Sequence, residues 1–126
     1  MFILIPAYEP GDRLPELVAE IVSRDSELGV LVIDDGSGPA FARVFERAAR
    51  AGAEVLRHAE NRGKGVALKT GLRHVAEHHP GDGVVTADAD GQHLVSDILA
   101  IVSEVRAGGE RAGSTMVLGC RGFVGD

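Results

Sequence analysis

The stretch Gly83–His93, with the sequence GVVTADADGQH, decides how the rest of the chain is interpreted. Its apolar residues 84–87 are typical of a short strand that is buried on both faces, and polar residues follow it directly. In open α/β folds the carboxyl ends of parallel strands line the crevice where ligands bind. The stretch therefore predicts an α/β fold with a polar site at the end of this strand.

Two carboxylates stand at this strand end. Asp88 and Asp90 are two residues apart, and Gln92 adds a carbonyl oxygen two residues further on. Without a cation the carboxylates would repel each other, so the spacing favours a hard divalent metal, Mn or Mg. An ordinary surface turn is the alternative reading, because Asp and Gly are frequent turn residues. An EF-hand is excluded, since Gly91 stands fourth from Asp88 rather than sixth and Leu99 occupies the place of its final Glu.

The composition of the 126 residues fits one domain around a single core. A net charge of −6 and a pI near 5.3 argue against a nucleic-acid groove, so local basic residues must carry any phosphate binding. The single cysteine, Cys120, excludes an internal disulfide and fits a cytoplasmic location. No apolar run is long enough for a membrane span, and residues 1–10 are expected to form a strand rather than a signal peptide.

Strand-like and helix-like segments alternate along the chain. Short apolar runs typical of strands occur at residues 2–5, 30–33, 53–56, 84–87 and 116–119. Apolar residues at helical spacing occur over 14–22, 41–48, 67–75 and 98–105, with Ser96 as the expected N-cap of the last helix. This alternation predicts a doubly wound, mostly parallel sheet with right-handed crossovers. A Rossmann-like strand order of 3-2-1-4 would bring the ends of the first, second and fourth strands together.

The ends of the first two strands carry further candidate ligand-binding residues. Asp34 and Asp35 follow the second strand, where an acid can accept hydrogen bonds from a ribose diol. Because neighbouring strand residues point to opposite sides, we expect Asp35 to face the ligand and Asp34 to close the turn. A turn without a ligand is the alternative. Tyr8 ends the first strand, where a nucleotide base can stack on it or where it can simply pack at the rim.

The loop at residues 61–65 opens the third helix. Its glycines allow a ligand to approach closely, and a helix N-terminus favours anions. It is not a Walker loop, because Lys64 is followed by Gly65, and it lacks the third glycine of a dinucleotide fingerprint. Lys64 is thus either a phosphate contact or a solvated turn residue.

The five histidines show little sign of metal spacing. Only His74 and His78 are four residues apart, and Val75 stands where an H-E-x-x-H motif has its Glu. We therefore expect both on a solvated helix face. The sequence assigns no metal role to His58.

Five blocks along the chain carry a family resemblance. They are IPAYE at 5–9, VIDDGS at 32–37, NRGKGVALKTG at 61–71, DADGQH at 88–93 and LGCRGF at 118–123. Together they resemble the inverting family-2 glycosyltransferases, most nearly the dolichyl-phosphate mannose or glucose synthase type. The resemblance covers essentially the whole chain, and five blocks in order are far more specific than one. It implies a GT-A fold binding a nucleotide-diphosphate sugar, with residues 1–126 as its N-terminal portion.

The resemblance also implies roles for single residues. Asp35 would hold the base or ribose, and Arg121 would neutralise phosphate or steer the donor sugar. Asp88 would contact the ribose and support the metal, while Asp90 and Gln92 would ligate the Mn or Mg that bridges the diphosphate. The complete donor-binding set that it implies is Pro6, Ala7, Tyr8, Glu9, Asp35, Lys64, Asp88, Ala89 and Arg121.

The chain departs from the family pattern in two places. Leu94 and Val95 stand where members usually have prolines, and the sequence ends at Asp126, before the mobile loop, catalytic base and acceptor-binding elements of the family. We therefore expect a truncated GT-A fold that binds a donor nucleotide and contains no catalytic base. Its open sheet edge predicts self-association into a homo-oligomer.

The implied function is metal-dependent transfer of a sugar from a GDP- or UDP-linked donor to an acceptor such as a polyprenyl phosphate, with the full-length protein at the cytoplasmic face of a membrane. A phospho-acceptor signalling domain is an alternative of similar length, but it needs paired acids after the first strand and a lysine after the fifth. A binding-only domain with the same fold stays open. A nucleotidyltransferase would show a Gly-rich basic loop where residues 9–12 stand.

Overall fold

Strands and helices follow one another in the alternating order that the sequence predicts. The computed structural model describes residues 1–89, 95–107 and 117–119. Within these ranges the strands are β1 (Phe2–Ala7), β2 (Gly29–Asp34), β3 (Glu54–Arg57), β4 (Val84–Thr86) and β5 (Val117–Gly119). The helices are α1 (Arg13–Arg24), α2 (Ala42–Ala51), α3 (Lys64–His78) and α4 (Val95–Ala107), with a short 3₁₀ turn, η1 (Pro39–Phe41), before α2. Each predicted strand and helix is confirmed, with ends that differ by a few residues. Among the helices described, none is long and apolar enough to cross a membrane.

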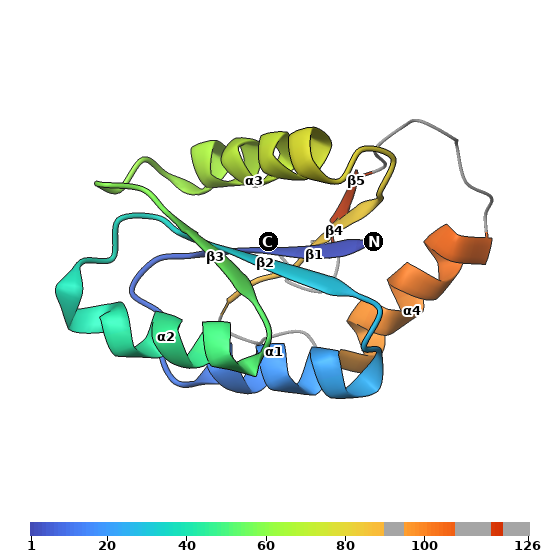
Figure 1. Ribbon diagram of the computed structural model, residues 1–126, viewed down its shortest axis with the longest axis horizontal. Helices are drawn as coiled ribbons and strands as arrows, with labels where there is room; N and C mark the ends of the chain where they lie inside the picture. Colours follow the sequence, from blue (N-terminus) through green and yellow to red (C-terminus); the bar gives the residue numbers. More distant parts are fainter. Residues whose placement is uncertain (90–94, 108–116, 120–126) are drawn as a thin grey trace.

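The strands form one parallel sheet in the order β3-β2-β1-β4-β5 (Figure 1). This confirms the predicted order of the first four strands and adds β5 beside β4. β1 and β2 are in register along their whole length and end together, with Ala7 opposite Asp34. β4 is shorter, but the chain continues alongside β1, since the Ala87 N–H donates to the Leu4 carbonyl at 3.0 Å. The carboxyl ends of the three central strands therefore reach the same edge of the sheet.

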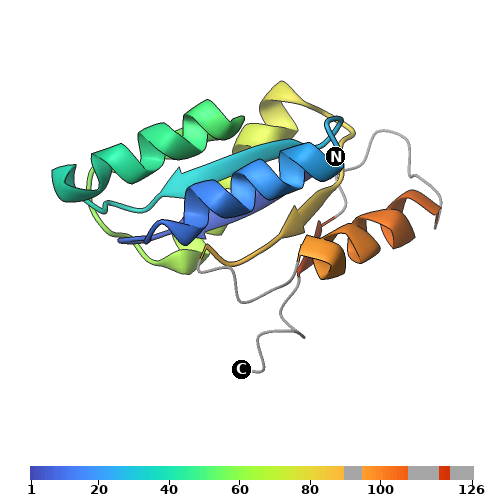
Figure 2. The same ribbon diagram turned by 90° about the horizontal axis from the view of Figure 1, so that it is seen from below.

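Helices cover both faces of this sheet, so the fold is doubly wound as predicted. α1, α2 and α4 lie on one face and α3 lies on the other (Figures 1 and 2). The side chains of β1 alternate between the two layers: Ile3 and Ile5 pack on the α1 side, and Leu4 packs on the α3 side. All three are fully buried. Burial on both faces explains why β1 is a continuous apolar run rather than an alternating one.

A glycine allows α3 to lie close to β1. Gly71 faces the sheet, and a Cβ atom at this position would collide with the Leu4 side chain. Helix propensity alone favours Ala over Gly by about 1 kcal/mol, so close packing rather than helix formation accounts for this residue. The close packing of α3 on the sheet also brings its first residue, Lys64, to the edge where β1 ends.

Two local predictions are wrong. Ser96 is not the N-cap of α4, because the helix already begins at Val95, whose buried side chain belongs to the same core cluster as Ile98. His74 is not on a solvated face: its side chain is only 14% exposed, and its Nε2 lies 2.8 Å from Glu54 Oε2. That acid comes from β3, so the spacing within the helix could not reveal it. His78 is exposed, as expected.

Candidate functional site

The ends of β1, β2 and β4 surround one cleft, as the predicted strand order implies. The cleft has a volume of about 490 Å³, a size that suits a small-molecule ligand. Segments that are far apart in the sequence line it together with the start of α3. The lining residues are Pro6, Ala7, Tyr8, Asp35, Asn61, Gly63, Lys64, Ala67, Asp88 and Ala89.

Most of the residues expected around a donor nucleotide lie in this lining. They are Pro6, Ala7, Tyr8, Asp35, Lys64, Asp88 and Ala89. Glu9 lies beside the cleft, whereas Asp90, Gln92 and Arg121 lie outside the described residues. The structure thus brings the described members of the set together, while their individual roles stay predictions.

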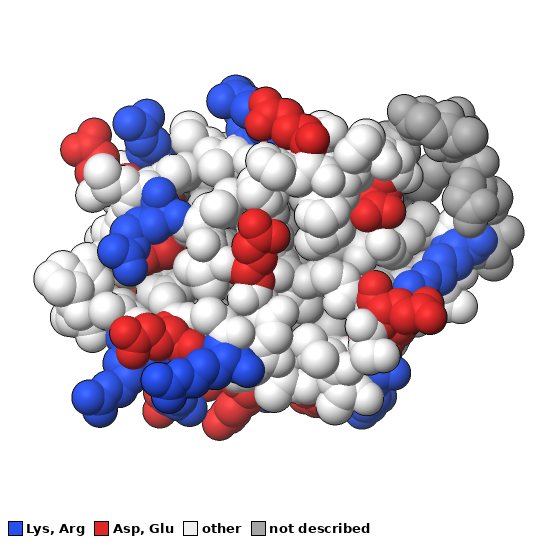
Figure 3. Space-filling model, in the orientation of Figure 1, with Lys and Arg blue, Asp and Glu red and all other residues white. Residues whose placement is uncertain are grey.

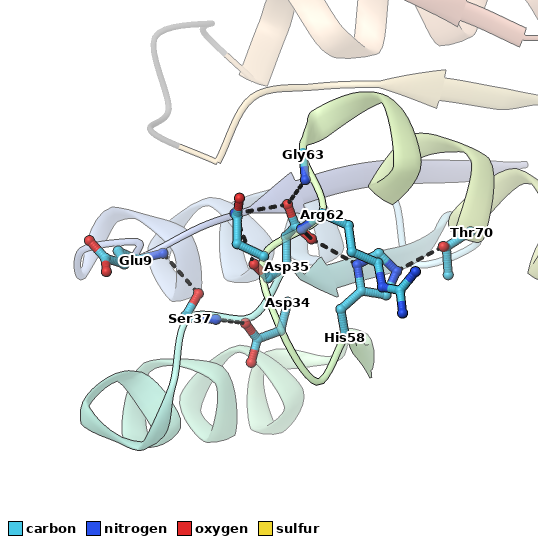
Figure 4. Close-up of polar contacts among 9 residues, drawn as sticks. Glu9, Asp34, Asp35, Ser37, His58, Arg62, Gly63 and Thr70 are labelled. Carbon is cyan, nitrogen blue, oxygen red and sulfur yellow. Dashed lines mark hydrogen bonds and ion pairs between the residues drawn. The ribbon is translucent and has the colours of Figure 1, made fainter.

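Short hydrogen bonds fasten the ends of β1 and β2 to each other. The Asp35 N–H donates to the Ala7 carbonyl at 2.9 Å, which extends the sheet by one residue. The Ser37 N–H donates to Asp34 Oδ1 at 2.9 Å, and the Ser37 hydroxyl oxygen accepts from the Glu9 N–H at 2.8 Å (Figure 4). Asp34 therefore closes the turn, as expected, and Asp35 is the acid that lines the cleft.

The turn after β2 also depends on a glycine. Gly36 has a φ of +74°, in the region that favours glycine. A Cβ atom here would collide with the backbone of Glu60 and Asn61. The turn after β2 and the loop before α3 therefore touch backbone to backbone, which fixes the loop against the edge of the sheet.

Asp35 is the centre of this contact. It is buried, and both of its carboxylate oxygens accept hydrogen bonds (Figure 4). Oδ1 accepts from His58 Nδ1 at 2.8 Å and from the Arg62 N–H at 3.0 Å. Oδ2 accepts from the Gly63 N–H at 2.8 Å and from Asn61 Nδ2 at 3.1 Å. One carboxylate thus holds the whole loop that leads into α3.

These bonds determine the protonation state of Asp35. Burial by itself raises the pKa of a carboxyl group, because it disfavours the charged form. Here the hydrogen bonds from His58, Arg62 and Gly63 outweigh burial and hold the pKa of Asp35 below its ordinary value. Asp35 is therefore an ionised carboxylate at neutral pH, which accepts hydrogen bonds and donates none.

An ion pair lies on another side of the cleft. Lys64 Nζ is 3.1 Å from Asp88 Oδ1. This ion pair joins the first residue of α3 to the segment that directly follows β4. The lysine side chain is 65% exposed and the aspartate side chain 20% exposed. Exposed pairs of this kind are worth about 1 kcal/mol or less, so this pair opens easily.

Tyr8 presents an aromatic ring at the rim of the cleft. It is 52% exposed, which is unusual for a large apolar side chain in this fold. A hydrogen bond to Glu9 and the charge of that carboxylate raise the pKa of Tyr8. The ring therefore stays a neutral phenol at physiological pH, with an apolar face available to a ligand.

Positive charge near the cleft is local. On the face drawn in Figure 3, basic and acidic side chains are interspersed rather than gathered by sign. The cleft itself has Lys64 and the first turn of α3, whose N–H groups lack partners within the helix. A helix N-terminus of this kind attracts anions. The start of α3 is therefore the part of the cleft best suited to phosphate.

The described part of the predicted metal site consists of Asp88 alone. The described residues include no group of three or more His, Cys, Asp or Glu side chains arranged around a common ion. Asp88 is a hard oxygen donor that faces the cleft, and a cation, Lys64 Nζ, already lies beside it. A metal ion at Asp88 would have to displace this ammonium group, which the exposed ion pair allows at low cost. The donor chemistry fits Mn or Mg, with Asp90 and Gln92 as the further predicted ligands.

Sequence reasoning assigned no role to two residues of the lining, Asn61 and Ala67, and gave Gly63 only the general role of letting a ligand approach closely. Asn61, Gly63 and Ala67 belong to the loop and helix that it identified, but only Lys64 among their neighbours was expected at the ligand. Asn61 donates through its amide nitrogen to the backbone carbonyl and to the carboxylate of Asp35, both at 3.1 Å. The sequence feature that could have identified these residues is the glycine-rich loop itself. It indicates that another group lies close to the loop backbone, but it does not show which group.

The chain matches the family model described as glycosyl transferase family 2 over residues 2–120. An uncharacterized protein of Methanocaldococcus jannaschii is 32% identical over 105 residues, which cover 83% of this chain and 41% of that protein. The undecaprenyl-phosphate 4-deoxy-4-formamido-L-arabinose transferases of Klebsiella pneumoniae and Salmonella paratyphi B are 34% and 30% identical over 119 residues. Those matches cover 89% of this chain and 35% of each transferase, so the chain spans well under half the length of these relatives. No solved structure matches the chain.

Proposed function

The chain belongs to glycosyl transferase family 2, and on this premise we propose that it forms the donor-binding part of a transferase that uses a GDP- or UDP-linked sugar. Its Rossmann-like parallel sheet agrees with the GT-A fold that the resemblance implies. The observation that carries the proposal is the convergence of Tyr8, Asp35, Lys64 and Asp88 on one cleft at the ends of three parallel strands.

The cleft offers a separate region for each part of a nucleotide. The exposed ring of Tyr8 provides a surface on which a base can stack. Residues around Asp35 form a rigid wall beside it. The first turn of α3 and Lys64 supply positive potential for the diphosphate. The nucleoside would thus lie towards β1 and β2, and the phosphates between α3 and β4.

The proposed metal site follows the same geometry. Asp88, Asp90 and Gln92 would hold a Mn or Mg ion, and the ion would supply positive charge to the departing nucleoside diphosphate. Arg121 would add positive charge to the same group. We further propose that transfer proceeds by in-line displacement with inversion, as the resemblance implies.

The proposed acceptor is a polyprenyl phosphate at the cytoplasmic face of a membrane. The support comes from the bacterial relatives, which are named as undecaprenyl-phosphate 4-deoxy-4-formamido-L-arabinose transferases. A phosphate oxygen is already a nucleophilic anion at neutral pH, so such an acceptor needs little deprotonation.

The proposal is tested by a thermal-shift panel of GDP, UDP, ADP and CDP with the 126-residue chain, each with Mn and with EDTA. We expect GDP or UDP to raise the melting temperature when Mn is present. A ligand at a hundredfold excess over its Kd stabilises the folded state by roughly 2.7 kcal/mol. ADP and CDP are the controls for non-specific binding of a diphosphate. The same shift with Mn and with EDTA would contradict a metal-bridged diphosphate, and no shift with any nucleotide would contradict donor binding.

A further inference from the structure

His58 joins the cleft to the middle of α3. It follows β3, its imidazole is only 11% exposed, and both ring nitrogens have a partner (Figure 4). Nδ1 lies 2.8 Å from Asp35 Oδ1, and Nε2 lies 2.8 Å from the Thr70 hydroxyl oxygen. A largely buried ring with two short polar contacts is held in one orientation. His58 is therefore a fixed link between Asp35 and a residue of α3 that does not line the cleft.

The ionised carboxylate of Asp35 determines which atoms of His58 and Thr70 donate hydrogen bonds. Asp35 is ionised and can only accept, so Nδ1 of His58 must carry the proton that it donates. In the neutral ring Nε2 is then an acceptor, and the Thr70 hydroxyl donates to it. Asp35 thus sets the tautomer of His58, and the Thr70 hydroxyl, which can donate or accept, adapts to it.

The protein's own donors fill the acceptor positions of Asp35. A carboxylate has two oxygens with about four acceptor sites. His58, Asn61 and the N–H groups of Arg62 and Gly63 supply four donors to them. A nucleotide hydroxyl would have to displace one of these bonds before it could reach the carboxylate. The bonds to Arg62 and Gly63 instead shape the backbone that begins α3 and lines the cleft.

We propose that His58 is a positioning residue for the cleft: it orients the Asp35 carboxylate, which in turn holds the backbone of Arg62 and Gly63 against the nucleotide site. Thr70 fixes the orientation of the His58 ring. The inference rests on the proposed function for its ligand, but the positioning of the loop is a property of the free protein. This positioning gives Asp35 an indirect effect on nucleotide binding, in place of the direct bond to the base or ribose that the resemblance implies.

Two substitutions distinguish the contributions of the two hydrogen bonds that the His58 ring nitrogens form. The amide nitrogen of Asn lies close to the position of Nδ1, so His58→Asn keeps a donor for Asp35 and loses the Thr70 contact. The amide of Gln reaches the position of Nε2, so His58→Gln keeps a partner for Thr70 and leaves Asp35 without its donor. Each variant loses one hydrogen bond, so the two form a matched pair for stability. His58→Ala loses both bonds.

The first measurement needs no ligand. Hydrogen exchange of the Arg62 and Gly63 amides is followed by NMR in the free wild-type chain and in the three variants. We expect exchange in His58→Asn to resemble that in the wild type. In His58→Gln and His58→Ala we expect these two amides to exchange about tenfold faster than in the wild type, after correction for any change in global stability. Unchanged exchange in His58→Ala would overturn the positioning role.

The second measurement is the Kd for GDP or UDP in the presence of Mn, whichever binds the wild-type chain more tightly. We expect His58→Asn to bind within about twofold of the wild type and His58→Gln to bind about tenfold more weakly, the loss typical of one hydrogen bond to a charged group. Equal affinities of the Asn and Gln variants would overturn the inference, because a purely structural role affects both alike. If the wild type binds neither nucleotide, the proposed function fails, and amide exchange still decides whether His58 positions the loop.

Discussion

The two polar walls of the cleft differ in how firmly their groups are held. In the wall formed by β2 and residues 58–63, Asp35 is buried and accepts four hydrogen bonds. In the wall that follows β4, Asp88 is partly exposed and pairs with Lys64, a flexible side chain in contact with solvent. Breaking a bond in the first wall leaves a buried group unsatisfied at a cost of about 1–3 kcal/mol, whereas the exposed pair opens for about 1 kcal/mol or less.

This difference matches two demands on a nucleotide-sugar site. The nucleoside is the same in the donor and in the product, so a rigid surface can hold it throughout. The diphosphate gains negative charge as the sugar departs, so cationic groups beside it, together with a bound metal, would stabilise it there. On the proposed function, the Asp35 wall would serve the nucleoside and the Asp88 wall would serve the diphosphate.

The largest expected effect comes from breaking the rigid wall at Gly36. We expect Gly36→Ala to lower the free energy of unfolding by roughly 3 kcal/mol, because the added methyl collides with the 60–61 backbone and the positive φ strains an L residue. Gly38→Ala is the matched control, since its φ is +90° but a Cβ there meets nothing within 4 Å. Strain alone should cost that variant about 1–2 kcal/mol, because a φ of +90° with a ψ of 171° is a conformation that L residues rarely adopt. Urea unfolding followed by circular dichroism measures both, and equal losses would show that the close approach of the two loops is unimportant.

A smaller effect follows from removing the carboxylate itself. We expect Asp35→Ala to lose roughly 2 kcal/mol at neutral pH, since the N–H groups of Arg62 and Gly63 lose their acceptor. Because the pKa of Asp35 is lower in the folded than in the unfolded chain, its ionic contribution is complete above the unfolded pKa of about 3.9. It is lost as the pH falls through the folded pKa.

The measurement is urea unfolding of the wild type and Asp35→Ala from about pH 7 down to about pH 3, below the unfolded pKa. The difference in stability between the two should be constant near neutral pH and should shrink below about pH 4. A difference that stays constant over the whole range would show that Asp35 is not stabilised in its charged form.

The smallest effect on stability is expected in the flexible wall. Asp88→Asn should change the free energy of unfolding by less than about 0.5 kcal/mol, because it removes only an exposed ion pair. On the proposed function it should nevertheless weaken Mn-dependent nucleotide binding by about tenfold or more, since a charge-assisted ligand is lost. Asp12→Asn is the matched control, because Asp12 forms an exposed pair with Arg47 at 2.8 Å and does not line the cleft. Asp88→Asn and Asp12→Asn should be equally stable, and nucleotide binding by Asp12→Asn should equal that of the wild type. Tight Mn-dependent binding by Asp88→Asn would remove Asp88 from the site.

Much of the fold was predictable because the patterns that encode it are local. The apolar run in β1 and the helical spacing of residues such as Leu14 and Leu17 can be read within one segment. The alternation of strands and helices then restricts the topology to a few arrangements, and the predicted order is the one observed. The same logic placed Tyr8, Asp35 and Asp88 at one cleft, since parallel strands end at the same edge.

The partners of the polar side chains were not predictable in this way. His58 was one histidine among five, yet it joins Asp35, 23 residues earlier, to Thr70 in α3. His74 was expected in solvent, yet it meets Glu54 from β3. The sequence by itself determined which segments form strands and helices and which strand ends carry acids, because periodicity and order along the chain are sufficient for that. Only the tertiary structure decided which donors fill Asp35 and which residue pairs with Asp88, because hydrogen bonds depend on positions to within a few tenths of an ångström, and such positions exist only once β2, β3 and α3 are packed together.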